Sequence, residues 1–118
     1  MSLRLGSKGG DVNNERYKRF GELLTQMKTL HDAKGKDYEG NGRPYENLRS
    51  GEKFGVRPWI MASMRANEKM HRLQSFAQTE SLNNESAFDS LIDIAILSMI
   101  AYVLLEEETT KTDTGMHL

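Results

Sequence analysis

Three acidic residues, Glu85, Asp89 and Asp93, recur at intervals of four in a segment whose pattern predicts a helix. At 3.6 residues per turn, each step moves the acid only about 40° around the helix axis, so the three form one stripe. Mg²⁺ and Mn²⁺ prefer oxygen ligands, and Mg²⁺ usually takes one or two carboxylates together with water and phosphate oxygens. The stripe is therefore a candidate site for Mg²⁺ or Mn²⁺.

A second explanation of the stripe needs no metal. Acidic side chains in the first turns of a helix complement the helix dipole, and spacing alone favours this explanation for Glu85 and Asp89. Asp93 lies too far along the helix for the dipole and borders an apolar face, where a carboxylate is costly unless it has a cation or a donor. We expect Asp93 either to bind the metal or to pair with Lys69 or Arg72 of the preceding helix.

Glu68 is a candidate fourth metal ligand, because it belongs to the neighbouring predicted helix. Lys69 and Arg72 follow it closely and could hold phosphate. The alternative, which spacing alone favours, is an exposed ion pair between Glu68 and Arg72, worth about 0.2–0.5 kcal/mol.

The segment from residue 34 to residue 57 is irregular and rich in charge. Three glycines and Pro44 interrupt its first part, residues 34–47, and loops of this length in a small domain are often functional or mobile. Its basic residues are Lys34, Lys36, Arg43, Arg49, Lys53 and Arg57. Nearby acids dilute this charge, so phosphate binding and a solvated loop are equally good interpretations.

Hydrophobic spacing predicts an all-α fold. Apolar residues at intervals of three and four indicate long helices near residues 14–34, 58–77 and 84–108, with a short helix near 45–50. Gly35 would end the first helix, and Pro58 would begin the third. We expect an antiparallel helical bundle formed by a single domain over residues 14–108, a disordered segment over 1–13 and a flexible tail over 109–118.

The segment Ile94–Leu105 has almost no polar face. Two partner helices in so small a domain cannot cover it, so the sequence predicts a homo-oligomer in which this segment is buried. The segment is shorter than the roughly 20 residues that a bilayer requires, and we expect no membrane association.

The overall composition excludes several other classes of function. The chain of 118 residues has 16 basic and 17 acidic residues, which gives no strong signal for nucleic-acid binding. It has no cysteine, which excludes disulfides and thiol chemistry and fits a cytoplasmic location.

Several short motifs of this chain resemble those of a known protein family, and they occur in the same order as in that family. They are Lys34-Gly-Lys-Asp-Tyr38, Tyr45-Glu-Asn47, Trp59, Glu68-Lys-Met-His-Arg72-Leu73 and Glu85-Ser-x-x-Asp89-x-x-x-Asp93. Over roughly residues 15–106 the chain resembles the nucleotide-modification-associated domain family, which occurs mostly in phage genomes. That family is in turn similar in plan to the all-α nucleoside triphosphate pyrophosphatases of MazG type. Those proteins are helical oligomers whose helix-borne acids bind Mg²⁺ for cleavage between the α and β phosphates.

The resemblance implies a Mg²⁺-dependent protein of phage nucleotide metabolism, with a nucleotide as its ligand or substrate. As a hydrolase it would cleave nucleoside triphosphates to release pyrophosphate. The metal ligands would be Glu68, Glu85, Asp89 and Asp93, and the phosphate-binding residues would be Lys36, Lys69 and Arg72, with Asp37, Tyr38 and Asn47 shaping the pocket. The MazG-type pattern has more acids than this chain, which places Lys69 and Arg72 after Glu68. The alternatives are a non-catalytic nucleotide-binding module and a structural helical oligomer.

Overall fold

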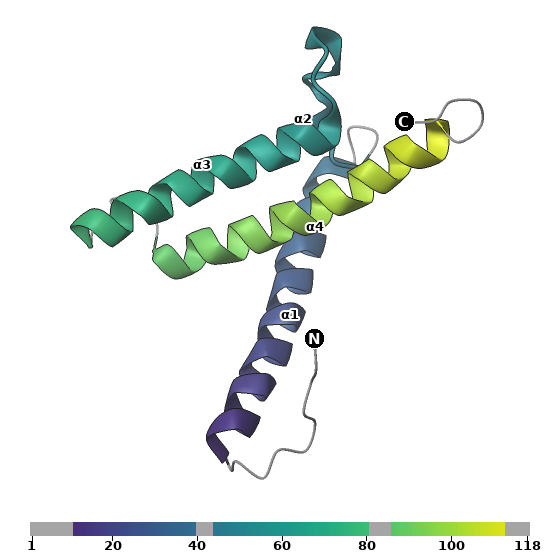
Figure 1. Ribbon diagram of the computed structural model, residues 1–118. Coiled ribbons are helices and arrows are strands. Elements are labelled where there is room, and N and C mark those ends of the chain that lie inside the picture. The colour runs from purple at the N-terminus through teal and green to yellow at the C-terminus, as the bar shows by residue number, and fades with distance from the viewer. Residues whose placement is uncertain (1–10, 40–43, 81–85, 113–118) are drawn as a thin grey trace. The chain divides into compact units, whose positions relative to one another are not determined.

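The computed structural model describes residues 11–39, 44–80 and 86–112, and all of its regular structure in these ranges is helical. Three long helices carry most of the chain: α1 (Asp11–Glu39), α3 (Pro58–Thr79) and α4 (Ala87–Thr112) (Figure 1). Between α1 and α3 lie the short helix α2 (Glu46–Arg49) and the 3₁₀ helix η1 (Glu52–Phe54). The predicted all-α class, with three long helices and a short one, is confirmed.

All three long helices end later than the sequence predicted, and the difference is largest for α1 and α4. α1 begins at Asp11 and continues to Glu39, so the expected helix end at Gly35 is wrong and residues 11–13 are helical. One glycine costs a helix only about 1 kcal/mol, and the lysines on both sides of Gly35 favour the helical state. α4 likewise continues past Glu108 to Thr112, which shortens the predicted tail.

The chain divides into two units, one up to Lys34 and one from Gly35 onward. The first unit holds most of α1, whose surface carries ion pairs between residues three and four apart. Arg19 pairs with Glu22 at 3.2 Å, and Lys28 pairs with Asp32 at 2.6 Å. Such pairs stabilise a helix locally by about 0.2–0.5 kcal/mol each. The sequence predicted one domain over residues 14–108, and the structure divides this range after Lys34.

In the second unit, α3 and α4 form an antiparallel hairpin (Figure 1). Ala62 on α3 and Ser90 on α4 are completely buried, and their small side chains allow the two helices to approach closely. The core of this unit groups apolar side chains from α2, α3 and α4: Tyr45, Leu48, Trp59, Met61, Ala62, Ile100, Ala101 and Leu104. This packing includes Trp59, which follows Pro58 at the beginning of α3.

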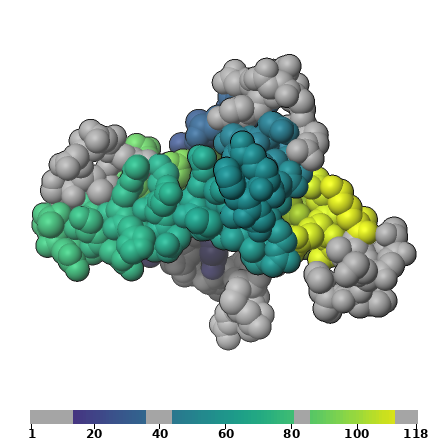
Figure 2. All heavy atoms as spheres, turned by 90° about the horizontal axis from the view of Figure 1, so that it is seen from above, coloured from purple at the N-terminus to yellow at the C-terminus, as the bar shows by residue number. Residues whose placement is uncertain are grey.

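The segment of α2 and η1 packs over the beginning of α3, as the space-filling view in Figure 2 shows. Gly51 is buried there, and a methyl group added to it would lie 2.8 Å from Met61 Cε. Gly55 follows η1 with φ of 83°, a conformation that glycine adopts without strain. Pro58 then begins α3 at the position that the sequence predicted.

α4 is also long and apolar enough to cross a membrane, judged by length and composition alone. Over Ala87–Lys111 its most apolar window reaches a mean hydropathy of 2.0. The core helix of a soluble protein meets the same criterion, so one such helix is weak evidence for a membrane-spanning segment. The sequence-based expectation considered only Ile94–Leu105, which is shorter than the helix that contains it.

Candidate functional site

The centre of the α3–α4 hairpin is joined by an ion pair between predicted site residues. Lys69 Nζ lies 3.0 Å from Asp93 Oδ2, and about a quarter of each side chain is exposed. Lys69 lies on the face of α3 that also carries Ala62, so it points toward α4. Asp93 therefore has the partner that the sequence offered as an alternative to a metal ligand.

Asp89 lies one turn before Asp93, in the first turn of α4. Its backbone N–H donates a 3.0 Å hydrogen bond to Ser86 Oγ, so Ser86 caps the helix and fixes where it begins. The Asp89 side chain is exposed. Its position fits the dipole explanation and leaves the carboxylate open to a ligand from solvent.

Glu68 and Arg72 are exposed on α3 near the same level of the hairpin. Because the two helices are antiparallel, Arg72 and Asp89 both lie beyond the Lys69–Asp93 pair, toward the connection between α3 and α4. We call Glu68, Lys69, Arg72, Asp89 and Asp93 the hairpin cluster. It contains both carboxylates and cations within about two helical turns.

Part of the predicted metal set cannot be placed. Glu85 lies outside the described residues, and among the residues that are described no three acidic or histidine side chains gather closely enough to hold a metal ion. The proposed ligand set of Glu68, Glu85, Asp89 and Asp93 therefore stays a prediction.

Apart from Lys69 and Arg72 of the hairpin cluster, the predicted phosphate-binding and pocket-shaping residues fall in two places. Lys36, Asp37 and Tyr38 belong to the last turns of α1, and their side chains lie outside the described part of the structure. Asn47 is half-buried in α2, where its carbonyl oxygen accepts a 2.9 Å hydrogen bond from Ser50 Oγ. The structure does not bring Asn47 to the hairpin cluster.

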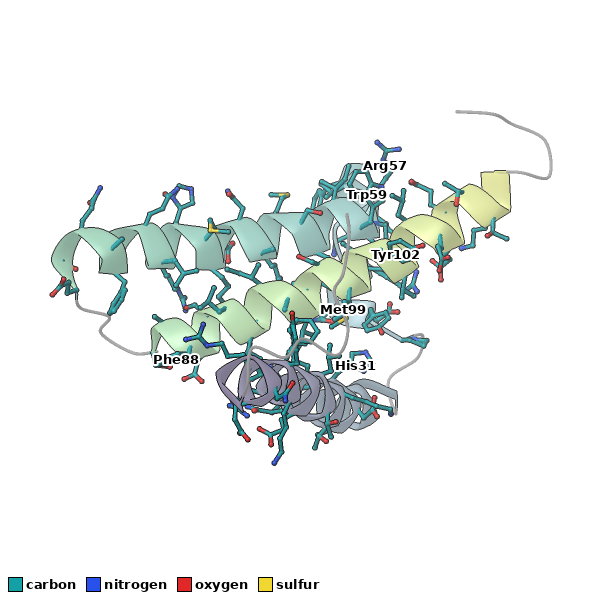
Figure 3. The ribbon with its side chains drawn as sticks, turned by 60° about the horizontal axis from the view of Figure 1, so that its bottom comes forward. His31, Arg57, Trp59, Phe88, Met99 and Tyr102 are labelled. Atoms are coloured by element: carbon teal, nitrogen blue, oxygen red, sulfur yellow. The ribbon has the colours of Figure 1, made fainter. Side chains whose placement is uncertain are left out.

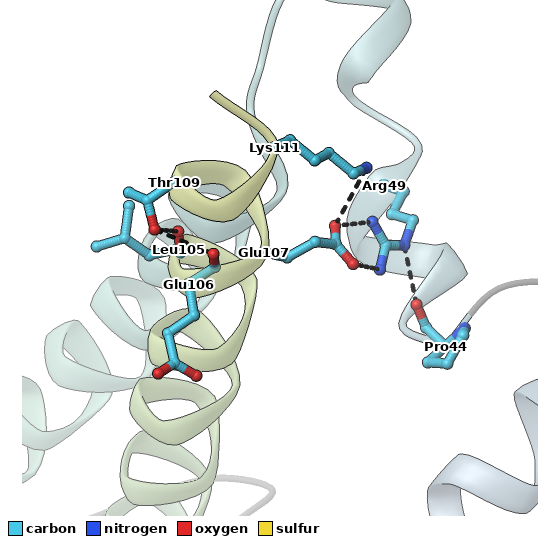
Figure 4. A network of polar contacts seen from close by, with 7 residues as sticks. All are labelled: Pro44, Arg49, Leu105, Glu106, Glu107, Thr109 and Lys111. Carbon is cyan, nitrogen blue, oxygen red and sulfur yellow. Dashed lines mark hydrogen bonds and ion pairs between the residues drawn. The ribbon is translucent and has the colours of Figure 1, made fainter. Parts of the chain in front are cut away.

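A second polar network lies near the C-terminal end of α4 (Figure 4). The buried Arg49 guanidinium donates hydrogen bonds of 2.7 and 3.0 Å to the two carboxylate oxygens of Glu107, and Nε donates a 2.9 Å bond to the Pro44 carbonyl. Hydrogen bonding to Glu107 raises the pKa of Arg49, so the guanidinium stays charged although it is buried. Lys111 approaches the same carboxylate at 3.8 Å.

Glu108 forms a parallel set of contacts with the beginning of α3. Its carboxylate accepts a 3.0 Å hydrogen bond from Trp59 Nε1 and lies 3.6 Å from Arg57 Nε. The Arg57 guanidinium in turn lies 5.7 Å from the centre of the Trp59 ring, within the range of a cation–π contact. These contacts hold the C-terminal part of α4 against the beginning of α3, at the end of the hairpin opposite the α3–α4 connection.

A hollow of about 270 Å³ opens beside this second network. Its lining combines acids, bases and a few apolar side chains: Glu52, Gly55, Val56, Arg57, Pro58, Leu104, Glu107, Glu108 and Lys111. Glu107 lies 14 residues from Asp93 on α4, which corresponds to about 21 Å along the helix. The hollow is therefore separate from the hairpin cluster. Two of its acids are already paired, Glu107 with Arg49 and Glu108 with Trp59 and Arg57.

The sequence did not identify the pairs Arg49–Glu107 and Trp59–Glu108. The sequence did contain one indication of the Arg49–Glu107 contact. A run of acids, Glu106 to Glu108, follows the apolar part of α4, and a basic loop lies earlier in the chain. Opposite charge made a contact between them plausible. The choice of partners depends on the register of α4 against α3, which charge alone does not fix.

Comparison of the chain with protein-family models, curated proteins and solved structures finds no match. The resemblance to the nucleotide-modification-associated domain family stays a prediction.

Proposed function

We propose that the protein binds a nucleotide together with Mg²⁺, through the nucleotide's phosphates, at the hairpin cluster. The observation that carries this proposal is the Lys69–Asp93 pair. It places an ammonium group and a carboxylate 3.0 Å apart on facing helices, each still partly open to solvent. A phosphate group carries negative charge that can pair with Lys69, and its bound Mg²⁺ carries positive charge that can pair with Asp93. One ligand can therefore contact both side chains.

The composition of the cluster fits a metal that arrives with the nucleotide. Mg²⁺ uses one or two protein carboxylates and takes its remaining ligands from water and phosphate. Asp89 is exposed on α4 and could provide one carboxylate, with Glu68 on α3 as a further acid. Asp93 could provide a second when a phosphate takes its place beside Lys69. Lys69 and Arg72 would neutralise phosphate charge. Bound Mg²⁺ would add positive charge where a leaving pyrophosphate develops negative charge.

Cleavage between the α and β phosphates is the reaction that the family resemblance implies, and we propose it as the activity of this site. Binding without turnover is the alternative, in which the protein would serve another nucleotide-modifying enzyme. A purely structural role is the third possibility, and the exposed apolar surface of α4 favours it.

The test is a calorimetric titration of the full chain with each common nucleoside triphosphate, with and without Mg²⁺, followed by an assay of pyrophosphate release. We expect binding that requires Mg²⁺ and is lost for the corresponding nucleosides. Lys69→Met should weaken binding about tenfold or more, since a hydrogen bond to a charged group contributes roughly 1.5–3 kcal/mol.

Lys53→Met is the matched control. It removes one lysine that is exposed on η1, outside the cluster, and should leave affinity unchanged. Melting curves of both variants show whether Lys69→Met remains folded. Equal affinity in Lys69→Met and wild type would contradict the proposed site. Binding with no pyrophosphate release would support the non-catalytic alternative, and the absence of any binding would leave the structural role.

A further inference from the structure

We propose that two copies of this chain associate through α4 in an antiparallel pair with two-fold symmetry. The surface concerned is the side of α4 that faces away from α3. Phe88 is 81% exposed and Tyr102 is 67% exposed, and Leu91 and Leu105 are exposed on the same side. Figure 3 shows Phe88 and Tyr102 along α4. This inference is independent of the proposed nucleotide site.

Five exposed side chains and the half-buried Ala95 follow the spacing of a helix-pairing seam. Residues 88, 91, 95, 98, 102 and 105 are separated alternately by three and four positions, which is the repeat that brings two helices together along their length. We call Phe88, Leu91, Ala95, Ser98, Tyr102 and Leu105 the α4 seam. None of them lies within the buried apolar cluster of the hairpin unit.

The seam has the same pattern of sizes when read in either direction. Phe88 and Leu105 are equally far from its midpoint, as are Leu91 and Tyr102, and Ala95 and Ser98. In an antiparallel pair, large side chains therefore meet large ones near both ends. The small residues Ala95 and Ser98 meet in the middle, where the helices approach most closely. A two-fold interface requires this kind of self-complementarity.

Charge also favours the antiparallel direction. Glu106 is exposed beside the seam, and in an antiparallel pair it lies at the level of the partner copy's first α4 residues. Helix N-termini attract negative charge, and the exposed Asp89 in the same first turn offsets part of this attraction. In a parallel pair, Glu106 would instead face the same residue of the other copy, and like charges would repel.

The exposed area is sufficient for such a pair. Phe88 and Tyr102 together expose on the order of 300 Å², since an aromatic side chain carries about 150–250 Å². With Leu91, Met99 and Leu105 the exposed apolar surface reaches on the order of 500 Å² per copy, at the upper end for one patch on a monomer. Two copies would bury on the order of 1,000 Å², the size at which a specific interface becomes plausible.

A lipid bilayer is the other environment that could cover α4, and the hairpin disfavours it. α4 packs along α3, which exposes Arg65, Glu68 and Arg72. Insertion of the hairpin would place these charges in lipid, at a cost of about 2.5–3.5 kcal/mol for an arginine near the centre of the bilayer. A second copy covers the apolar seam and leaves the charges in water.

The first test is the mass in solution, measured by light scattering at micromolar concentration. We expect twice the chain mass of 13.4 kDa. Tyr102→Glu should give a folded monomer, because Tyr102 lies outside the hairpin core. Phe54→Glu is the control, since Phe54 is a similarly exposed aromatic residue on η1, and it should stay dimeric. A folded wild-type monomer would overturn the proposal, as would binding to lipid vesicles in place of dimerisation.

The second test determines the direction, and it uses the absence of cysteine from the chain. Leu91→Cys mixed with Tyr102→Cys should form a disulfide between the two variants under mild oxidation. Leu91→Cys alone should not, since in the antiparallel pair its two copies lie about 16 Å apart along the helix, beyond the reach of a disulfide. Efficient cross-linking of Leu91→Cys with itself would indicate a parallel pair and overturn the antiparallel assignment.

Discussion

Arg49 on α2 and Glu107 on α4 form a bidentate ion pair with hydrogen bonds of 2.7 and 3.0 Å. The Arg49 side chain is only 5% exposed, and its third hydrogen bond holds the Pro44 carbonyl. The contact joins residues 58 positions apart and links the irregular segment before α3 to the C-terminal part of α4. In this structure Arg49 is thus a structural residue.

Arg49→Lys should destabilise the protein although it keeps the charge. Lysine cannot donate two parallel hydrogen bonds to a carboxylate, and the Pro44 carbonyl loses its donor. We expect a loss of about 1.5–3 kcal/mol in the free energy of unfolding, measured with urea. Lys53→Arg is the control, because it exchanges the same two residue types at an exposed position. Equal stability of Arg49→Lys and wild type would show that the second hydrogen bond to Glu107 contributes nothing to stability.

The overall fold followed from the sequence because it depends on periodicity. The apolar spacing around Trp59 and the position of Pro58 gave α3 within two residues of its observed ends. The end of α1 was predicted incorrectly because Gly35 was interpreted as a cap. A glycine is compatible with both a cap and a helix interior, and the choice depends on the energy of the whole helix.

The site was less predictable than the fold. Spacing on α4 placed Asp89 and Asp93 one turn apart, and the neighbouring helix offered Lys69 or Arg72 as a partner for Asp93. Selection of Lys69 required the register between α3 and α4, which the fully buried Ala62 and Ser90 help to set. That register depends on how side chains interdigitate across the interface, and no single helix contains this information.

Replacement of two glycines by alanine should have opposite effects. At Gly35 a new methyl group meets no atom within 4 Å, and the residue lies inside α1. Gly35→Ala should therefore raise helicity and stabilise α1 by about 0.5–1 kcal/mol. At Gly51 the methyl group would lie 2.8 Å from Met61 Cε and 3.1 Å from Val56 Cβ, and overpacking of this kind costs about 1–3 kcal/mol.

Circular dichroism and thermal unfolding of the two glycine variants provide the measurement. A loss of helicity in Gly35→Ala would mean that Gly35 ends the helix after all, since a cap in the left-handed conformation disfavours alanine. If Gly51→Ala were as stable as wild type, Met61 would have room to move aside.

Asp32 on α1 should titrate at an unusually low pH. Its carboxylate accepts a 2.6 Å hydrogen bond from Lys28 and lies 2.9 Å from His31 Nδ1. The bond from Lys28, followed by that from His31, lowers the pKa of Asp32. Because the folded pKa is below the unfolded one, the stabilisation is present above the unfolded value of about 3.9 and is lost as pH falls through the folded value.

NMR titration of the Asp32 side chain measures this directly. Lys28→Met should move the pKa upward toward about 3.9. It should also reduce the loss of α1 stability on acidification below that pH. Lys18→Met, which removes another exposed lysine of the same helix, should leave the Asp32 titration unchanged. An identical Asp32 titration in Lys28→Met and wild type would show that the pair does not persist in solution.

Asp89 separates the metal interpretation of the hairpin cluster from the dipole interpretation. Asp89→Asn retains the backbone N–H that donates to Ser86 Oγ, so the cap of α4 persists while one negative charge is removed. If Asp89 binds Mg²⁺ or Mn²⁺, the metal should raise the melting temperature of the wild type, because a ligand that binds only the folded state stabilises it. We expect this rise, and we expect Asp89→Asn to abolish it.

The matched control for Asp89→Asn is Glu15→Gln, which removes an exposed acid near the beginning of α1. It should leave the metal-induced rise in melting temperature unchanged. If Asp89 serves only the helix dipole, the result differs in two ways. Asp89→Asn would then cost roughly 0.3–1 kcal/mol without metal, and Mn²⁺ would shift neither protein. A wild-type response that survives in Asp89→Asn would exclude this residue as a ligand and leave Asp93 and Glu68 as the remaining described acids of the cluster.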